Sequence, residues 1–157
     1  MTEFSPPILS LLIVLPLFGA IGLALLRDDR SARLYALLLA LIEVLLSLVP
    51  LLLFEPDSSR VQLLERLPWI PSLNIAYVVG LDGLSVYFPL MTAVVHLAVM
   101  VSTWTQIHRQ TRLHLGLLLM LEGVTMGVFS ALDLMLFLLF WELTLVPTFF
   151  LISLYGV

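Results

Sequence analysis

The sequence contains no cysteine, which excludes disulfide bonds and thiolate metal sites. Lysine is absent as well, so all seven basic residues are arginines, and the formal net charge is −4. Because positive charge is scarce, the chain is not expected to bind nucleic acid. The sequence also lacks a phosphate-binding glycine loop, a metal-ligand spacing and a nucleophile elbow. The chain is therefore expected to bind no cofactor and no metal ion itself.

Hydrophobic residues are what the sequence has in abundance. They make up 61% of the chain, charged residues make up 11%, and the mean hydropathy is +1.13. A soluble domain of this length could not cover so much apolar surface. The predicted fold class is therefore an all-α integral membrane protein surrounded by the lipid bilayer.

Five apolar runs divide the chain. They predict five transmembrane helices, at about residues 8–26, 34–54, 82–104, 113–131 and 133–155. The first run is followed by arginines rather than preceded by them, so it is expected to be a retained helix and not a secretory signal. One long polar loop separates the second run from the third. Within it, residues 73–79 are rich in β-branched side chains and predict a short strand, for which no partner is evident.

The arginines predict how the chain lies in the membrane. Five of the seven fall in the turns at 27–33 and 105–112, whereas the long loop has two and the turn at 130–133 has none. Short loops rich in arginine stay on the cytoplasmic side of a membrane. We therefore expect the N-terminus and the long loop to be extracytoplasmic, and Val157 to be inside.

The fifth apolar run carries Glu142 near its centre and Pro147 five residues later. A carboxylate at the centre of a membrane helix costs roughly 2.5–3.5 kcal/mol, so Glu142 should be neutral, paired with a cation or beside water. Pro147 cannot donate the backbone hydrogen bond that the carbonyl of Leu143 would accept, which leaves an acceptor next to the acid. These residues fit a proton-carrying site, and they equally fit a kinked helix whose glutamate is hydrogen-bonded to a neighbour.

Glu122, in the fourth apolar run, is expected to lie level with Glu142. The turn near Leu132 makes the two helices antiparallel, and each glutamate is ten residues from that turn. At about 1.5 Å per residue, both lie about 15 Å from it, which is half of a roughly 30 Å hydrocarbon core. Whether the carboxyls face each other depends on helix rotation, which the sequence does not determine. If they do, they would titrate as a pair.

Four further polar residues have mainly structural interpretations. Glu43 and His96 are interpreted as side chains that are hydrogen-bonded within the helix bundle, with proton transfer as the alternative for both. Asp82 is predicted to cap the third helix by accepting hydrogen bonds from the amides of its first turn. Ser31 is the expected N-cap of the second helix.

Several stretches of the sequence resemble one family. They are Gly80-Leu-Asp-Gly-Leu-Ser85, the run from Glu122 to Asp133, Phe140-Trp-Glu-Leu-Thr-Leu-Val-Pro147, Leu154-Tyr-Gly156 and Leu67-Pro-Trp-Ile-Pro71. In these residues the chain is similar to chain 4 of proton-translocating NADH-quinone oxidoreductase, or respiratory complex I. The bacterial form of chain 4 is called subunit M, and plastids and cyanobacteria have a plastid-type form of the same protein. The resemblance runs from about residue 8 to the last residue.

The resemblance implies that Glu142 is the essential acid of a proton channel and that Glu122 takes part in proton transfer. In the family, the partner of the fifth-helix glutamate is a lysine on a broken seventh helix, and the whole chain has about fourteen helices, partly arranged as inverted repeats. The present sequence has no lysine and five predicted spans, so residues 1–157 resemble the N-terminal third of such an antiporter-like subunit. Its expected partners are the missing C-terminal helices and the other membrane subunits of the complex.

The resemblance also implies a function and a location. The complex would pass electrons from NAD(P)H or a related donor to a quinone, in a bacterial inner membrane or a cyanobacterial thylakoid membrane. This chain would be a non-redox subunit of that translocase and would contribute half of a proton channel, with no activity as a fragment alone. The alternatives are a subunit of a sodium/proton antiporter or of a membrane-bound hydrogenase, and a structural membrane protein without transport activity.

Overall fold

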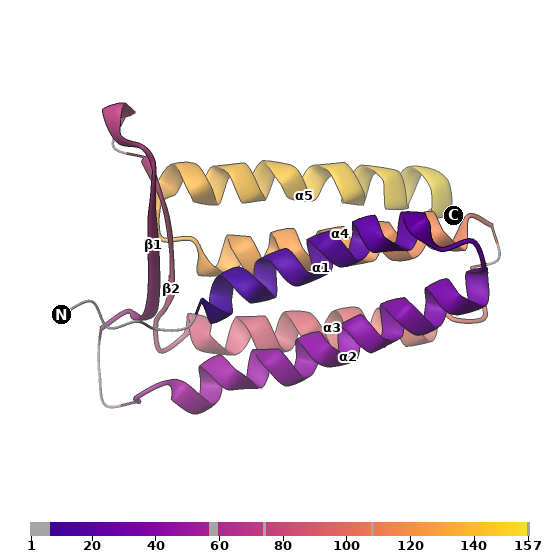
Figure 1. The fold of residues 1–157 in the computed structure, drawn as a ribbon, viewed down its shortest axis with the longest axis horizontal. Helices are drawn as coiled ribbons and strands as arrows, with labels where there is room; N and C mark the ends of the chain where they lie inside the picture. Colours follow the sequence, from indigo (N-terminus) through magenta and orange to yellow (C-terminus); the bar gives the residue numbers. More distant parts are fainter. Residues whose placement is uncertain (1–6, 57–59, 74, 108, 157) are drawn as a thin grey trace.

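The computed structural model describes residues 7–56, 60–73, 75–107 and 109–156, which form five long helices and a two-stranded hairpin (Figure 1). The helices are α1 (Ile8–Leu25), α2 (Asp29–Leu53), α3 (Phe88–Ser102), α4 (Thr111–Ser130) and α5 (Leu134–Tyr155). A single 3-10 turn, Ser85–Tyr87, leads into α3. Counted with that turn, all five are long and apolar enough to cross a membrane, which confirms the predicted fold class.

Successive helices run in opposite directions. The hairpin and the start of α1 therefore lie at one end of the bundle, and the end of α5 lies at the other (Figure 1). The connections between α1 and α2 and between α3 and α4 are both at the end opposite the hairpin. They hold Arg27 and Arg109, and Arg30, Arg33 and Arg112 follow near the starts of α2 and α4. The predicted orientation requires these five arginines to lie together at one end of the bundle. Which end of the bundle faces the cytoplasm stays a prediction. Val157, which was predicted to be on the cytoplasmic side, lies outside the described residues.

Helix α2 starts earlier than predicted, because Asp28 and not Ser31 is its N-cap. The Asp28 carboxylate accepts hydrogen bonds from the Ser31 amide and from the Ser31 hydroxyl, both at 3.1 Å. The bond from the Ser31 amide lowers the pKa of Asp28. The expectation for Ser31 was therefore wrong. A carboxylate and a hydroxyl can both accept a hydrogen bond from a free amide. The carboxylate is also negatively charged, so it interacts favourably with the positive end of the helix dipole.

The long polar loop forms an antiparallel hairpin of β1 (Gln62–Ile70) and β2 (Ile75–Leu81). Strand β2 confirms the strand predicted at 73–79, of which Asn74 lies outside the described residues. Its partner β1 escaped prediction because Pro68 and two charged side chains interrupt any alternation of apolar residues. Proline and charge are typical of an exposed edge strand, and both strands of a two-stranded sheet are edges.

Two sets of hydrogen bonds hold the hairpin on the bundle. The Glu65 carboxylate of β1 accepts from the backbone amides of Leu9 at 2.7 Å and Ser10 at 3.1 Å, and also from the Ser10 hydroxyl. These are free amides of the first turn of α1, so Glu65 caps that helix from a distant part of the chain. At the α4–α5 turn, the Leu132 amide donates to the Val78 carbonyl at 2.9 Å. The hairpin is thereby fixed to both α1 and the α4–α5 turn.

Helix α4 lies at the centre of the packing, and α5 is peripheral. Helix α4 contacts each of the other four helices, whereas α5 packs chiefly on α4 and β2. Close approach of α4 to α1 requires glycine at position 123, where a Cβ atom would lie 2.7 Å from the Ile13 carbonyl oxygen. Helix α5 uses one face for its contact with the bundle, through Leu136, Phe140 and Pro147. The opposite face of α5 is exposed.

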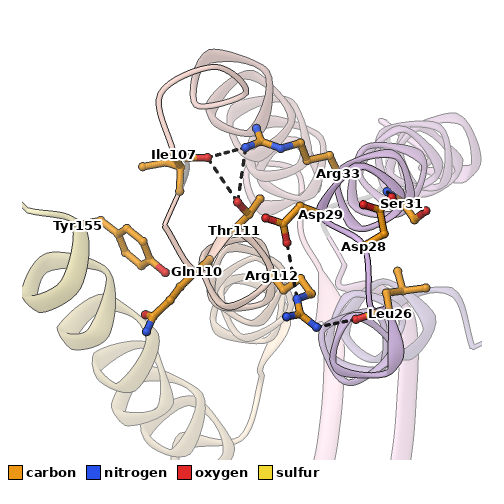
Figure 2. A network of polar contacts seen from close by, with 10 residues as sticks. All are labelled: Leu26, Asp28, Asp29, Ser31, Arg33, Ile107, Gln110, Thr111, Arg112 and Tyr155. Atoms are coloured by element: carbon orange, nitrogen blue, oxygen red, sulfur yellow. Dashed lines mark hydrogen bonds and ion pairs between the residues drawn. The ribbon is translucent and has the colours of Figure 1, made fainter.

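A polar network fastens the helix ends opposite the hairpin (Figure 2). The Arg33 guanidinium donates to the carbonyls of Trp104 and Ile107, and it lies 3.5 Å from the Thr111 hydroxyl. Nearby, Arg112 donates to the Leu26 carbonyl at 2.8 Å. Arginine thus satisfies backbone carbonyls that the ends of the helices leave unpaired. The network fixes the α3–α4 turn against α2 and sets the axial register of α2, α3 and α4.

Candidate functional site

Glu142 lies on the exposed face of α5. It is two residues beyond the buried Phe140, which places it about 200° around the helix from that side chain. Its neighbours on the same face are large exposed apolar residues, among them Leu138, Leu145 and Phe149. The carboxyl group therefore points away from the five-helix bundle and stands alone within an apolar surface.

A shallow hollow of about 330 Å³ opens beside Glu142. Its lining comes from the tip of the hairpin and from one face of α5: Trp69, Ile70, Ile75, Met135, Leu138, Leu139 and Glu142. Figure 1 shows the hairpin rising past the start of α5, which explains how residues so distant in sequence meet there. The hollow gives the glutamate a partly enclosed apolar setting without supplying it with a cation.

Glu122 occupies a different environment. Its side chain on α4 is fully buried, and neither of its carboxyl oxygens has a hydrogen-bond partner among the described residues. Glu122 lies eight residues before the end of α4, and Glu142 lies eight residues after the start of α5. Both are thus about 12 Å from the turn that joins the helices. The structure keeps the two glutamates at one level, but it does not bring them together, because Glu142 is on the far side of α5.

Glu43 on α2 is a second carboxyl inside the bundle. Its side chain is also fully buried, and its oxygens also lack partners among the described residues. The interpretation of Glu43 as hydrogen-bonded to a helix neighbour was therefore wrong. The buried hydroxyl of Ser47, one turn further along α2, donates to the Val44 carbonyl and not to Glu43, and the other buried residues of α2 are alanine, leucine and proline.

A signal for the burial of Glu43 was present in the sequence. The buried positions of α2 include Ala32, Ala36, Ala40, Glu43 and Ser47, which recur at intervals of three and four residues. Small residues at this spacing mark the side of a membrane helix that packs against other helices. Glu43 falls on that stripe and not on the lipid-facing side.

His96 and Asp82 have the structural roles that were expected of them. His96 is buried on α3, and its Nδ1 atom lies 2.9 Å from the Thr92 carbonyl oxygen. The Asp82 carboxylate accepts from the amides of Leu84 at 3.1 Å and Ser85 at 2.7 Å, and the bonds from Ser85 lower the pKa of Asp82. In return, the Ser85 hydroxyl accepts from the Asp82 amide at 2.8 Å. Asp82 therefore caps the start of the third span.

The arrangement supports proton binding more readily than the binding of a metal ion. Within the described ranges, no group of three or more histidine, aspartate or glutamate side chains could hold a metal. What the helices present instead is one exposed carboxyl on α5 and two buried carboxyls between α2 and α4. A carboxyl group binds a proton without the further ligands that a metal ion needs.

The sequence has relatives of named function, although no protein-family model matches it. It is 36% identical over 150 residues to the F(420)H(2) dehydrogenase subunit M of Methanosarcina mazei, across 96% of this chain and 30% of that protein. It is 38% identical over 153 residues to an NAD(P)H-quinone oxidoreductase chain 4 of Thermosynechococcus vestitus, across 96% of this chain and 28% of that protein. The chain thus spans less than a third of the length of these relatives.

A solved structure shares the fold. A chain of respiratory complex I from Thermus thermophilus with bound NADH matches with a TM-score of 0.79 and 28% sequence identity, over 94% of this chain and 29% of that chain. Sequence and structure therefore agree, and they confirm the resemblance that the motifs indicated. The chain is homologous to the N-terminal part, about 30%, of complex I chain 4 and of F(420)H(2) dehydrogenase subunit M.

Proposed function

We propose that this chain is a membrane subunit of a complex I-type oxidoreductase that passes electrons to a quinone, and that it contributes half of a proton channel. The names of its relatives indicate NAD(P)H or F(420)H(2) as the electron donor. The chain has no cysteine with which to bind an iron–sulfur cluster, so its part in the complex is proton movement and not redox chemistry. It acts together with other membrane subunits, in a bacterial inner membrane or a thylakoid membrane, with its N-terminus outside.

The observation that carries this proposal is the position of Glu142. A carboxylate on a lipid-facing surface near mid-membrane is costly, and intramembrane acids almost always face protein or a water-filled cavity. The exposed face of α5 is therefore a face that further helices cover in the working protein. We propose that those helices bring a cation to Glu142, as the family's lysine does. This sequence has no lysine, so the cation comes from the remainder of the family's chain or from a separate polypeptide.

The chemistry follows from electrostatics. A cation close to Glu142 favours the ionised carboxylate, and withdrawal of that cation into an apolar surrounding favours proton uptake. Pro147 removes the helical hydrogen bond that the Leu143 carbonyl would otherwise accept, so a water molecule can bind one position from the acid. Glu122 provides a further proton-binding carboxyl at the same level of the membrane. Residues 1–157 then act as the N-terminal part of one antiporter-like subunit.

The test has two stages. The membrane complex is first purified through this chain, and its components are identified by mass spectrometry. Quinone-reductase subunits together with the missing helices are the expected result. Recovery of antiporter or hydrogenase subunits alone, or of a lone five-helix protein, would overturn the assignment.

Proton pumping is then measured in vesicles that hold the assembled complex. We expect Glu142→Gln to abolish pumping while the complex still assembles, and Glu122→Gln to cause a smaller loss. Asp82→Asn is the matched control, because it removes a carboxylate charge from a helix cap outside the proton path. Normal pumping by Glu142→Gln would contradict the role of this residue, whereas equal and complete losses in all three variants would indicate a folding defect.

A further inference from the structure

Glu43 and Glu122 form a cluster that the proposed function does not explain. Both side chains are fully buried inside the bundle, and none of the four carboxyl oxygens has a hydrogen-bond partner among the described residues. A buried polar group without a partner carries a large desolvation cost, and proteins rarely keep one without a reason. Two such groups, on the helices α2 and α4 that pack against each other, call for a ligand that binds there.

The register of the helices places the two carboxyls at one depth. Helices α2 and α4 run in the same direction, and the contact between Arg33 and Thr111 aligns their first turns. Glu43 is ten residues beyond Arg33, and Glu122 is eleven residues beyond Thr111. At about 1.5 Å per residue, both lie about 15–17 Å from that contact, near the middle of a roughly 30 Å hydrocarbon core.

Among the described residues, the helices α1, α3 and α5 around the pair contain no arginine. Helix α1 contains no titratable side chain at all. Helix α3 contributes His96, whose Nδ1 atom is hydrogen-bonded to the Thr92 carbonyl oxygen. Helix α5 carries Glu142 on its exposed face, pointing away from the bundle. The arginines nearest in sequence, Arg33 and Arg112, lie in the first turns of α2 and α4 and bind carbonyls at the helix ends.

These surroundings indicate which ligand the two carboxyls bind. Two ionised carboxylates without a cation would repel each other in a medium that also desolvates them, so the group neutralises by taking up a proton. A metal ion needs more ligands, and the described residues hold no suitable group of three. We propose that Glu43 and Glu122 form a proton-binding pair, separate from Glu142, in which at least one carboxyl is protonated at neutral pH. The pair shares Glu122 with the proposed function, but it requires neither Glu142 nor pumping.

Infrared spectroscopy of the purified protein, with the subunits that accompany it, tests the proposal directly. A protonated carboxyl has a carbonyl stretching band that an ionised one lacks, and the band shifts when the exchangeable proton is replaced by deuterium. The wild-type protein should show this band at neutral pH, and across the full pH range the pair should lose its two protons in two steps, because interacting sites titrate as a pair. Glu43→Gln and Glu122→Gln should each reduce the band and leave a single step.

Three controls keep the result interpretable. Glu55→Gln makes the same chemical change at an exposed position outside the helices and should leave the band unchanged. Glu43→Asp keeps a carboxyl at the buried position and should retain two steps. Glu142→Gln should retain the steps of the pair even if pumping is lost, so failure of the proposed function and failure of the pair can be told apart. A neutral-pH spectrum that is the same in wild type, Glu43→Gln and Glu122→Gln would overturn the proposal.

Discussion

Gly123 lies where α4 crosses α1, and we expect Gly123→Ala to weaken that contact. The added Cβ atom would lie 2.7 Å from the Ile13 carbonyl oxygen and 2.8 Å from the Cγ atom of Leu17. The first of these neighbours is backbone, so α1 as a whole has to move away. Overpacking of this kind costs about 1–3 kcal/mol.

Gly116 offers a matched control on the same side of α4. It precedes Gly123 by seven residues, or about two helical turns, and a Cβ atom there would have one neighbour, the Ala20 carbonyl oxygen at 3.8 Å. Both substitutions replace glycine inside a helix, which by itself favours the helix by about 0.8–1 kcal/mol. That gain cancels when the two variants are compared. Gly116→Ala should therefore be the more stable of the two by about 1–3 kcal/mol, or about 5- to 150-fold in the unfolding equilibrium.

The comparison is made by unfolding the purified variants in detergent and following near-ultraviolet circular dichroism. Wild type, Gly116→Ala and Gly123→Ala are measured side by side, under conditions in which unfolding is reversible. Equal stability of the two alanine variants would refute the close α1–α4 packing. If Gly116→Ala lowers the free energy of unfolding more than Gly123→Ala does, the tight α1–α4 contact lies at Gly116 and not at Gly123.

Two further predictions concern the ends of the helices. Arg33→Lys keeps the charge but not the planar fork that binds the carbonyls of Trp104 and Ile107, so the free energy of unfolding should fall by about 1.5–3 kcal/mol. Arg112→Lys affects one bond, to the Leu26 carbonyl, and a half-exposed ion pair, so it should change the free energy of unfolding by less than about 1 kcal/mol. A loss equal to that of Arg33→Lys would contradict the role of the two bonds from Arg33. Because bonds from Ser85 lower the pKa of Asp82, its contribution to stability is complete above the ordinary value of 3.8 and is lost as the pH falls further, toward the folded-state pKa. Asp82→Asn should flatten this acid dependence of the thermal midpoint, and an unchanged slope would contradict the cap.

The sequence was sufficient for the features that depend on local patterns. Long apolar runs are visible without tertiary contacts, because the bilayer demands about 20 apolar residues from each spanning helix. The cap at Asp82 is local too, since its partners are two and three residues away. The level of Glu122 and Glu142 followed from residue counts around a tight turn. Strand β1 could not be found in this way, because it pairs with β2 across the hairpin and its own residues resemble a polar loop.

Helix rotation is what the tertiary structure alone decided. The rotation of α4 depends on where Gly123 and Gly127 let α1 and α5 approach, and these are contacts between residues far apart in the chain. The rotation of α5 depends on Phe140 and Pro147 packing against α4. Residue counts set the depth of a side chain, since each residue adds a fixed rise, but only packing sets the direction in which it points. For this reason the sequence predicted the level of its acids, whereas the fold buried Glu122 and Glu43 inside the bundle and left Glu142 on the open face.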